Sequence, residues 1–308
     1  MTTDLDAGRR PARRTGLRLL RVALDAARPR QWLKNVLVLA APAAAGVLDR
    51  EEVLARVLVV VVAFCLIASS GYLVNDVVDA ERDRLHPRKR LRPVAAGDLS
   101  RQAALLLAAI GFAAGLALCA AVSAHVLALA LTYAALTLCY SLWLKREPVI
   151  EMFLLAGAFV LRAAAGGAAA HVHLSGWFVV VVSFGALFVV AGKRHGELVA
   201  VGSDAMTRGT LAHYPLNFLR YLWMMSSTIA VSAYCVWAFS QVSPHASDRP
   251  WLEASIAPFT LGVVRYALLI EEGRGGAPTE VFLRDRVLQL AGLTWIGIYL
   301  TGVYAIGV

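Results

Sequence analysis

The sequence predicts an all-α, polytopic membrane protein with nine transmembrane helices and its N-terminus in the cytoplasm. Of its 308 residues, 59% are hydrophobic, and the mean hydropathy is +0.64. This composition is too apolar for an ordinary soluble domain. The apolar residues form nine blocks, each near the roughly 20 residues that an α-helix needs to cross a bilayer. Basic residues gather in alternate connections between the blocks, as expected for cytoplasmic loops.

The polar start of the chain is expected to stay outside the bilayer. Residues 1–27 are rich in Arg, Ala and Gly and predict a disordered basic tail without a removable signal peptide. Residues 28–308 are expected to form a single transmembrane catalytic domain. The predicted spans are 33–48, 53–76, 101–122, 124–143, 149–170, 174–192, 219–241, 251–271 and 286–307.

The formal net charge of +9 has a one-sided distribution. Of the 30 Lys and Arg residues, all but Arg50, Arg56, Arg249 and Arg162 lie in the tail or in connections on that same side. The positive-inside rule then places the N-terminus and the large polar loops in the cytoplasm and the C-terminus outside. The charge therefore indicates a membrane orientation, and we expect no nucleic-acid partner.

Carboxylates and an amide emerge from an apolar run at residues 72–93. If this segment is helical through residue 83, then Asn75, Asp79 and Asp83 stack on one face at i, i+4 and i+8. Oxygen ligands of this kind suit Mg²⁺ that also contacts phosphate oxygens. Asp76 lies one residue off that face and is expected to orient a basic partner. Lys89 follows in a dense basic cluster, and we interpret the segment as a cytoplasmic site for a metal-bound diphosphate.

Three further elements on the same side carry basic residues, and one more arginine falls inside a predicted span. Lys34 is either a lipid-headgroup anchor or a substrate contact, and Lys145 is either an orientation signal or part of the site. Arg162 would lie inside a span, where an arginine faces a polar cavity or pairs with a carboxylate such as Glu151. Lys193 and Arg194 follow the sixth predicted span and are candidates for phosphate contacts.

Other common site chemistries find no support in the sequence. The four cysteines lie inside apolar blocks without metal-like or redox spacing, and His171 and His173 fall on the opposite side as expected loop residues. We find neither a phosphate-cradling GxxxxGK[ST] loop nor a serine nucleophile elbow.

The run Asn75–Asp83 fits the pattern NDxxDxxxD, and with nine spans the chain resembles the UbiA superfamily of intramembrane prenyltransferases. The resemblance implies Mg²⁺ held by this motif and by a second aspartate-rich motif between spans six and seven. Here that region reads Gly192–Glu197 with an isolated Asp204, which departs from the two-aspartate pattern.

Segments 28–42, 72–79, 86–97, 191–194 and 283–290 resemble the decaprenyl-phosphate phosphoribosyltransferase branch of that superfamily. The resemblance implies transfer of 5-phosphoribose from phosphoribosyl pyrophosphate (PRPP) to a polyprenyl phosphate at the cytoplasmic face of the plasma membrane. Pyrophosphate would be released, and the product would serve cell-wall arabinan synthesis. A basic, cytoplasm-facing pocket with one metal site suits this anionic donor.

On this basis we assign expected roles to the candidate residues. Asn75, Asp79 and Asp83 would hold Mg²⁺, with Asp76, Asp79 and Asp83 as the catalytic carboxylates. The expected substrate contacts are Lys34, Tyr72, Lys89, Arg92, Lys145, Arg162, Lys193 and Arg194. Two alternatives are a prenyl diphosphate to aromatic acceptor transferase and a non-enzymatic polyprenyl-phosphate carrier. The acceptor chain length and a homo-oligomeric state stay open.

Overall fold

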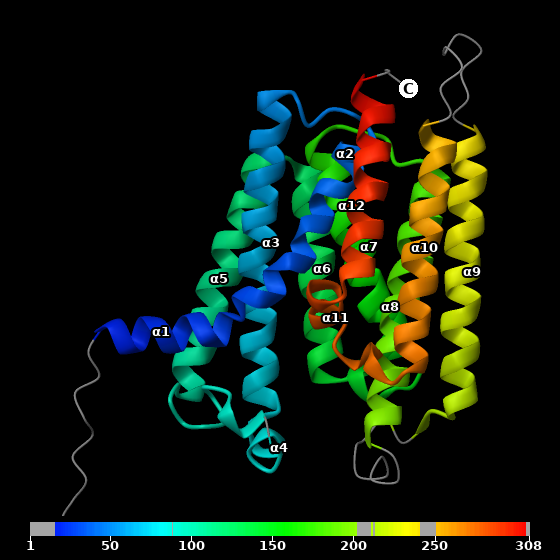
Figure 1. The fold of residues 1–308 in the computed structure, drawn as a ribbon. Coiled ribbons are helices and arrows are strands. Elements are labelled where there is room, and N and C mark those ends of the chain that lie inside the picture. Colours follow the sequence, from blue (N-terminus) through cyan, green and yellow to red (C-terminus); the bar gives the residue numbers. More distant parts are fainter. Residues whose placement is uncertain (1–15, 88, 202–210, 212, 241–250, 306–308) are drawn as a thin grey trace, which may run out of the picture.

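The computed structural model is a bundle of antiparallel helices (Figure 1). It describes residues 16–87, 89–201, 211, 213–240 and 251–305. The elements in chain order are α1 (Gly16–Ala27), η1 (Pro29–Leu39), α2 (Ala40–Ala44), α3 (Glu51–Val78), α4 (Ala80–Arg84), η2 (Lys89–Leu91), α5 (Arg101–Val122), α6 (Ala124–Leu142), η3 (Leu144–Arg146), α7 (Ile150–Ala169), α8 (Gly176–Val201), α9 (Leu216–Ser240), α10 (Trp251–Glu271), η6 (Arg274–Gly276), α11 (Pro278–Arg284), α12 (Arg286–Leu300) and η7 (Thr301–Ala305).

Eight helices in the described ranges are long and apolar enough to cross a membrane, namely α3, α5 to α10, and α12 with η7. Small residues bring them close together. A Cβ on Gly115 of α5 would lie 2.9 Å from the carbonyl oxygen of Ala63 in α3, so the two backbones nearly touch. Such close approach is typical of helix contacts in lipid, where packing rather than water exclusion drives association. The predicted all-α membrane fold is therefore confirmed at this coarser level.

The first predicted span differs from the others. Instead of one α-helix over 33–48, the chain forms the 3₁₀ helix η1 followed by the short helix α2. The reason is a very close contact: a Cβ on Gly166 of α7 would lie 1.7 Å from the carbonyl oxygen of Val38. A 3₁₀ helix is narrower than an α-helix and fits this space. The nine-helix count is thus not confirmed by helix length alone.

Residues 16–27, which we expected to be disordered, form the amphipathic helix α1. One face packs through Val22 and the buried Ala26 against Leu73 of α3. Leu20 and Leu24 on another face are 58% and 46% exposed. In Figure 1, α1 (dark blue) runs across the axis of the bundle, an arrangement typical of a helix in the membrane interface. The remainder of the predicted tail, residues 1–15, lies outside the described residues.

The polar connections α3–α5, α6–α7 and α10–α12 lie at one end of the bundle, the lower end in Figure 1, where α8 also ends. At this end α8 continues to Val201, beyond the predicted end at residue 192. Gly192 and Gly196, on one face of α8, allow this extension because the η6 connection packs directly against them. A Cβ on Gly196 would lie 2.4 Å from the backbone nitrogen of Gly276. Lys193 and Arg194 therefore project from a rigid helix, not from a loop.

We expect Gly196→Ala to lower the free energy of unfolding by about 1–3 kcal/mol, because the added methyl group would push two backbones apart. The matched control is Gly185→Ala on the same helix, where a Cβ meets nothing within 4 Å. That control should be neutral or slightly stabilising, since Ala is the better helix former. Thermal unfolding in detergent measures both, and equal unfolding temperatures for the two variants would contradict the close packing.

Candidate active site

The acidic motif lies where α3 ends. Helix α3 stops at Val78, Asp79 forms the junction, and the short α4 follows. The i, i+4 hydrogen bonds continue across the junction, from the Asp79 amide to the Asn75 carbonyl (2.9 Å) and from the Asp83 amide to the Asp79 carbonyl (2.8 Å). The prediction of a single helix through residue 83 is wrong, because the helix is interrupted at Asp79. The hydrogen bonds between residues four apart are nevertheless retained.

Asn75 and Asp79 converge on one cation. The ammonium group of Lys145, from η3, donates to Asp79 Oδ1 at 2.6 Å and to Asn75 Oδ1 at 3.3 Å. All three side chains are partly buried. This contact brings residues about 70 positions apart in the chain to one place, as the sequence analysis predicted for the cytoplasmic elements.

Asp83 and Asp76 converge on a different cation. Arg92 Nη1 donates to Asp83 Oδ2 at 2.6 Å and to Asp76 Oδ1 at 3.2 Å, and Arg28 also donates to Asp76. Asp76 thus has basic partners, as expected. Asp83 thus forms its hydrogen bond with Arg92, whereas Asn75 and Asp79 accept from Lys145. The break in the helix at Asp79 turns Asp83 toward the η2 segment, so the motif divides into two pairs.

Lys89 lies in the exposed η2 segment, within electrostatic range of both carboxylate pairs and of α8. The charged groups that act on it are Arg92, Asp83, Asp79 and Glu197. Desolvation by the surrounding chain, with repulsion from Arg92, lowers the pKa of Lys89 below its usual range. The influence of Glu197 links the η2 segment to the end of α8.

Arg194 is held by two carboxylates rather than presented to solvent. Its guanidinium group donates from Nε and Nη2 to the fully buried Glu151 at 2.7 and 2.6 Å, and from Nη1 to Glu197 at 2.8 Å. Lys193 differs, because its ion pair with Glu197 is longer, at 3.6 Å, and 41% of its side chain is exposed. Of the two basic residues predicted on α8, Lys193 is therefore the more accessible one.

A tight turn precedes Glu151. Val149 adopts φ 66° and ψ −53°, and the Ile150 amide donates to the Pro148 carbonyl at 2.7 Å, which defines a γ-turn. This backbone conformation is strained for a β-branched residue. The hydroxyl oxygen of Tyr214 compensates by accepting from the Val149 amide at 2.7 Å. Burial raises the pKa of Tyr214 to about 12, so the hydroxyl stays protonated.

Arg162 lies within α7 and is 4% exposed. It does not pair with Glu151, the carboxylate partner considered from the sequence, because Glu151 binds Arg194. Its guanidinium group donates instead to Asn35 and Tyr133. Lys34 is half-buried and lies within electrostatic range of Lys193.

Tyr72, the remaining predicted contact, packs its ring against the guanidinium carbon of Arg28 at 5.0 Å from the ring centre. This contact orders the junction between α1 and η1. The geometry shows no direct link between Tyr72 and the Lys145 or Arg92 groups.

Sequence reasoning missed four residues that organise this site. A signal was available for Glu151, because an acidic residue beside an apolar span is as informative as Arg162. No comparable signal existed for Asn35 and Glu197, whose roles depend on contacts between distant elements, or for Arg28, which resembled an ordinary anchor. The contacts that reveal them are Asn35 with Arg162, Glu151 and Glu197 with Arg194, and Arg28 with Asp76.

The donor set at Asn75 and Asp79 fits a hard cation. Two side-chain oxygens already surround the position of one positive charge, and Mg²⁺ is commonly held by one or two carboxylates together with substrate phosphates. Within the described residues no group of three His, Cys, Asp or Glu side chains could hold a metal alone. A metal here would therefore take its other ligands from substrate and water.

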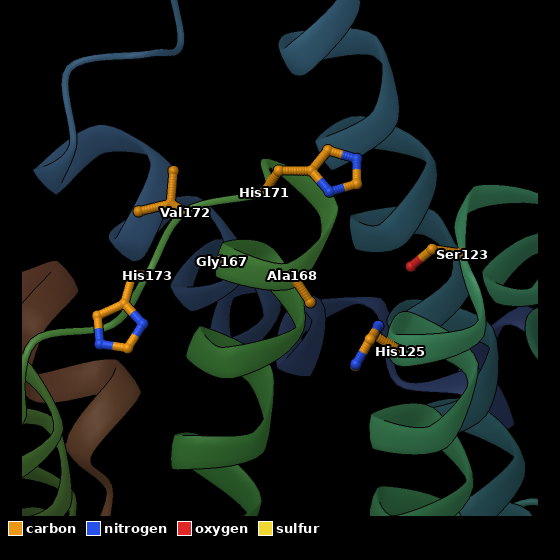
Figure 2. Close-up of a pocket in the computed structure, with 7 residues that line it drawn as sticks. All are labelled: Ser123, His125, Gly167, Ala168, His171, Val172 and His173. Carbon is orange, nitrogen blue, oxygen red and sulfur yellow. The ribbon is translucent and has the colours of Figure 1, made fainter.

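The opposite end of the bundle holds a pocket lined in part by His125, His171 and His173 (Figure 2). The three imidazoles do not converge, because His125 and His171 lie on one side of α7 and His173 on the other. His171 and His173 are at the end of α7 away from Lys145. This pocket is separate from the charged site.

Fold and site together define a membrane-embedded helical protein with a polar, phosphate-compatible site at one end of the bundle. The model of the UbiA prenyltransferase family matches residues 35–293. The chain belongs to that family.

Two curated relatives extend this result over nearly the whole chain. Decaprenyl-phosphate phosphoribosyltransferase of Mycolicibacterium smegmatis is 42% identical over 292 residues, covering 91% of this chain and 92% of the relative. The protein of the same name from Mycobacterium tuberculosis strain H37Rv is 43% identical over 278 residues, covering 89% and 91%. The resemblance to this branch is thereby confirmed.

Solved structures confirm the fold. A UbiA homologue from Archaeoglobus fulgidus, bound to GPP and Mg²⁺, superposes with a TM-score of 0.71. It is 17% identical, and the match covers 92% of this chain and all of that one. At this identity the likeness concerns the arrangement of helices alone.

Proposed function

We propose that this protein transfers 5-phosphoribose from PRPP to a polyprenyl phosphate and releases pyrophosphate. The observation that carries the proposal is the match of 42% identity, over nine-tenths of both chains, to a decaprenyl-phosphate phosphoribosyltransferase. The site is compatible with this reaction, because it places several cations and two metal-compatible oxygens at one end of the bundle. The decaprenyl chain is the acceptor expected from the relatives' name.

The charge balance of the site supports this donor over a prenyl diphosphate. A second aspartate-rich motif would give a second metal site, but the corresponding part of α8 carries Lys193 and the carboxylate-bound Arg194. PRPP carries a diphosphate and a separate 5-phosphate, and basic side chains suit both. The aromatic prenyltransferase alternative is disfavoured on this ground.

In the proposed reaction Asn75 and Asp79 would hold Mg²⁺, which would supply neutralisation of the diphosphate charge. Lys145 then moves from Asp79 to a phosphate oxygen, while Lys89 and Lys193 screen the remaining phosphate charge. The bond from ribose C1 to the diphosphate breaks, and an oxygen of the lipid phosphate bonds to C1 from the opposite face. Because that oxygen is already anionic, no general base is required. The residues act by positioning and by electrostatic stabilisation.

We propose that η1 and α2 form a ninth crossing of the plasma membrane. The 11 residues of η1 at about 2.0 Å each and the 5 residues of α2 at about 1.5 Å each span about 30 Å, the thickness of a hydrocarbon core. With residues 28–308 as one domain, the basic excess then places the N-terminus and the site in the cytoplasm.

The test uses purified protein in nanodiscs with PRPP and decaprenyl phosphate, with and without Mg²⁺. We expect pyrophosphate release that requires both substrates and the metal. Release of no pyrophosphate, together with binding of the lipid, would instead identify a polyprenyl-phosphate carrier. Turnover of a prenyl diphosphate with an aromatic acceptor, and none with PRPP, would support the other alternative.

A further inference from the structure

Arg162 is a buried cation without a carboxylate partner among the ion pairs of the described chain. Its three nitrogens each donate to a neutral group: Nε to Asn35 Oδ1 at 2.7 Å, Nη1 to the Ala158 carbonyl at 2.7 Å, and Nη2 to the Tyr133 hydroxyl at 2.6 Å. The Tyr133 ring also lies 4.6 Å from the guanidinium carbon. Burial and these three bonds to protein groups hold the guanidinium group in one position. The arrangement indicates a structural anchor rather than a direct contact to substrate.

The partner of this anchor, Asn35, joins three elements. It is fully buried within η1, accepts from Arg162 of α7, and donates through Nδ2 to the Cys65 sulfur of α3 at 3.1 Å. Each bond of Asn35 is therefore made to a different transmembrane helix. Loss of the amide would release η1 from both.

A second contact fixes the same two elements. Asn35 and Val38 are three residues apart and share one face of a 3₁₀ helix. Arg162 and Gly166 are four residues apart and share one face of α7. The Gly166 backbone lies directly against the Val38 carbonyl, where a Cβ would come within 1.7 Å. Two contacts, one turn apart, therefore set both the position and the rotation of η1.

This rotation determines where Lys34 points. With three residues per turn, neighbours on a 3₁₀ helix project about 120° apart. Once Asn35 faces α7 and α3, Lys34 must project to a different side, and the cations Lys193, Arg162 and Arg28 lie within electrostatic range of its ammonium group. Lys34 takes part in none of the ion pairs of the described residues. A fixed ammonium group among other cations favours an anion as its ligand.

We propose that Asn35 and Arg162 are positioning residues that orient Lys34 toward a phosphate group of a substrate. The identity of that group rests on the proposed function: it belongs either to the diphosphate of the sugar donor or to the phosphate of the lipid acceptor. The shared chemistry is a phosphate oxygen contacting the Lys34 ammonium group.

The test measures dissociation constants of inorganic pyrophosphate and of decaprenyl phosphate for the full chain in nanodiscs, so it does not depend on turnover. Lys34→Ala should weaken one of the two probes at least about tenfold, the loss expected for one charge-assisted contact. Weakened pyrophosphate binding assigns Lys34 to the donor, and weakened lipid binding assigns it to the acceptor.

Asn35→Leu should weaken the same probe by a similar factor, because it removes the bonds to Arg162 and Cys65 at nearly constant volume. Asn35→Asp, which keeps the oxygen that faces Arg162, should restore binding to within about threefold. The double variant Lys34→Ala/Asn35→Leu should bind no more weakly than Lys34→Ala, because Asn35 acts through Lys34. A purely structural role would instead make the two losses multiply.

Tyr133→Phe is a milder variant, since it removes only the hydroxyl that accepts from Arg162 and keeps the ring. It should shift the same probe in the same direction if Asn35→Leu does not fold. Unchanged affinity for both probes in folded Lys34→Ala, or in folded Asn35→Leu and Tyr133→Phe, would overturn the inference. Failure of the unmodified protein to consume PRPP would contradict the proposed function and leave this comparison of affinities intact.

Discussion

Replacement of Asp79 by Asn is expected to lower kcat/KM for PRPP by about 100-fold or more, the loss typical when one preorganised electrostatic contact is removed from a phosphoryl or acyl transfer site. Asn keeps the shape of the side chain and a hydrogen bond to Lys145 but removes the negative charge. The variant should fold normally, and it should need a higher Mg²⁺ concentration for half-maximal rate. Steady-state kinetics across a Mg²⁺ titration provide the measurement.

Glu81→Gln is the matched control, because Glu81 lies two residues further along the same motif. Its side chain is 70% exposed and, within the described residues, its ion pairs are with Arg84 and Arg101 on the surface. Exposed ion pairs contribute little to stability, so this variant should retain kcat/KM within a few-fold. An Asp79→Asn protein with the full rate, or a Glu81→Gln protein as impaired as Asp79→Asn, would show that the metal site lies elsewhere.

Glu151→Gln is expected to destabilise the folded protein by about 3–5 kcal/mol, the cost of leaving a buried charge without its partner. Glu151 is fully buried and accepts two bonds from Arg194, which also donates to Glu197. Without the Glu151 carboxylate, Arg194 loses the fully buried partner that accepts two of its bonds and keeps only the bond to the more exposed Glu197. The apparent unfolding temperature in detergent, together with denaturant unfolding, measures the loss.

The Arg220–Glu271 pair supplies the control, because it has the same two-bond geometry, at 2.9 and 2.9 Å, on the surface. Glu271→Gln should cost at most about 1 kcal/mol. If the two substitutions lowered the unfolding temperature equally, burial would not be what makes the Glu151–Arg194 pair important. A normal unfolding temperature for Glu151→Gln would contradict the structural role assigned to Arg194.

The fold could be predicted largely from hydrophobicity, because the length of an apolar run and the bilayer thickness are simple quantities. The first span shows where this reasoning ends. Its apolar pattern does not distinguish a 3₁₀ from an α-helix, and the choice is made by Gly166, more than 120 residues later in the chain. Likewise, the Arg-rich composition of the tail predicted disorder, whereas residues 16–27 form a helix that packs one face on α3.

The site was predictable in its residue types but not in its pairings. The spacing of Asn75 and Asp79 indicated a common face, and the structure places both on Lys145. Asp83 bonds to Arg92, whereas Asn75 and Asp79 accept from Lys145, because the helix breaks at Asp79. The i, i+4 spacing in the sequence does not reveal this break. Arg162 was expected to face a polar cavity or to pair with a carboxylate such as Glu151. Its partner is instead a neutral amide from η1. Pairings of this kind follow from three-dimensional packing and leave no local pattern in the sequence.

The most direct test of the proposed reaction traces the phosphate oxygens of the lipid acceptor into the products. Decaprenyl phosphate labelled with ¹⁸O at the three non-bridging phosphate oxygens is incubated with PRPP, and lipid product and released pyrophosphate are analysed by mass spectrometry. The proposed attack by the lipid phosphate on ribose C1 predicts a lipid product that carries a phosphoribosyl group and all three labelled oxygens, with unlabelled pyrophosphate. Labelled oxygen in the pyrophosphate, or a lipid product without the phosphoribosyl group, would contradict it.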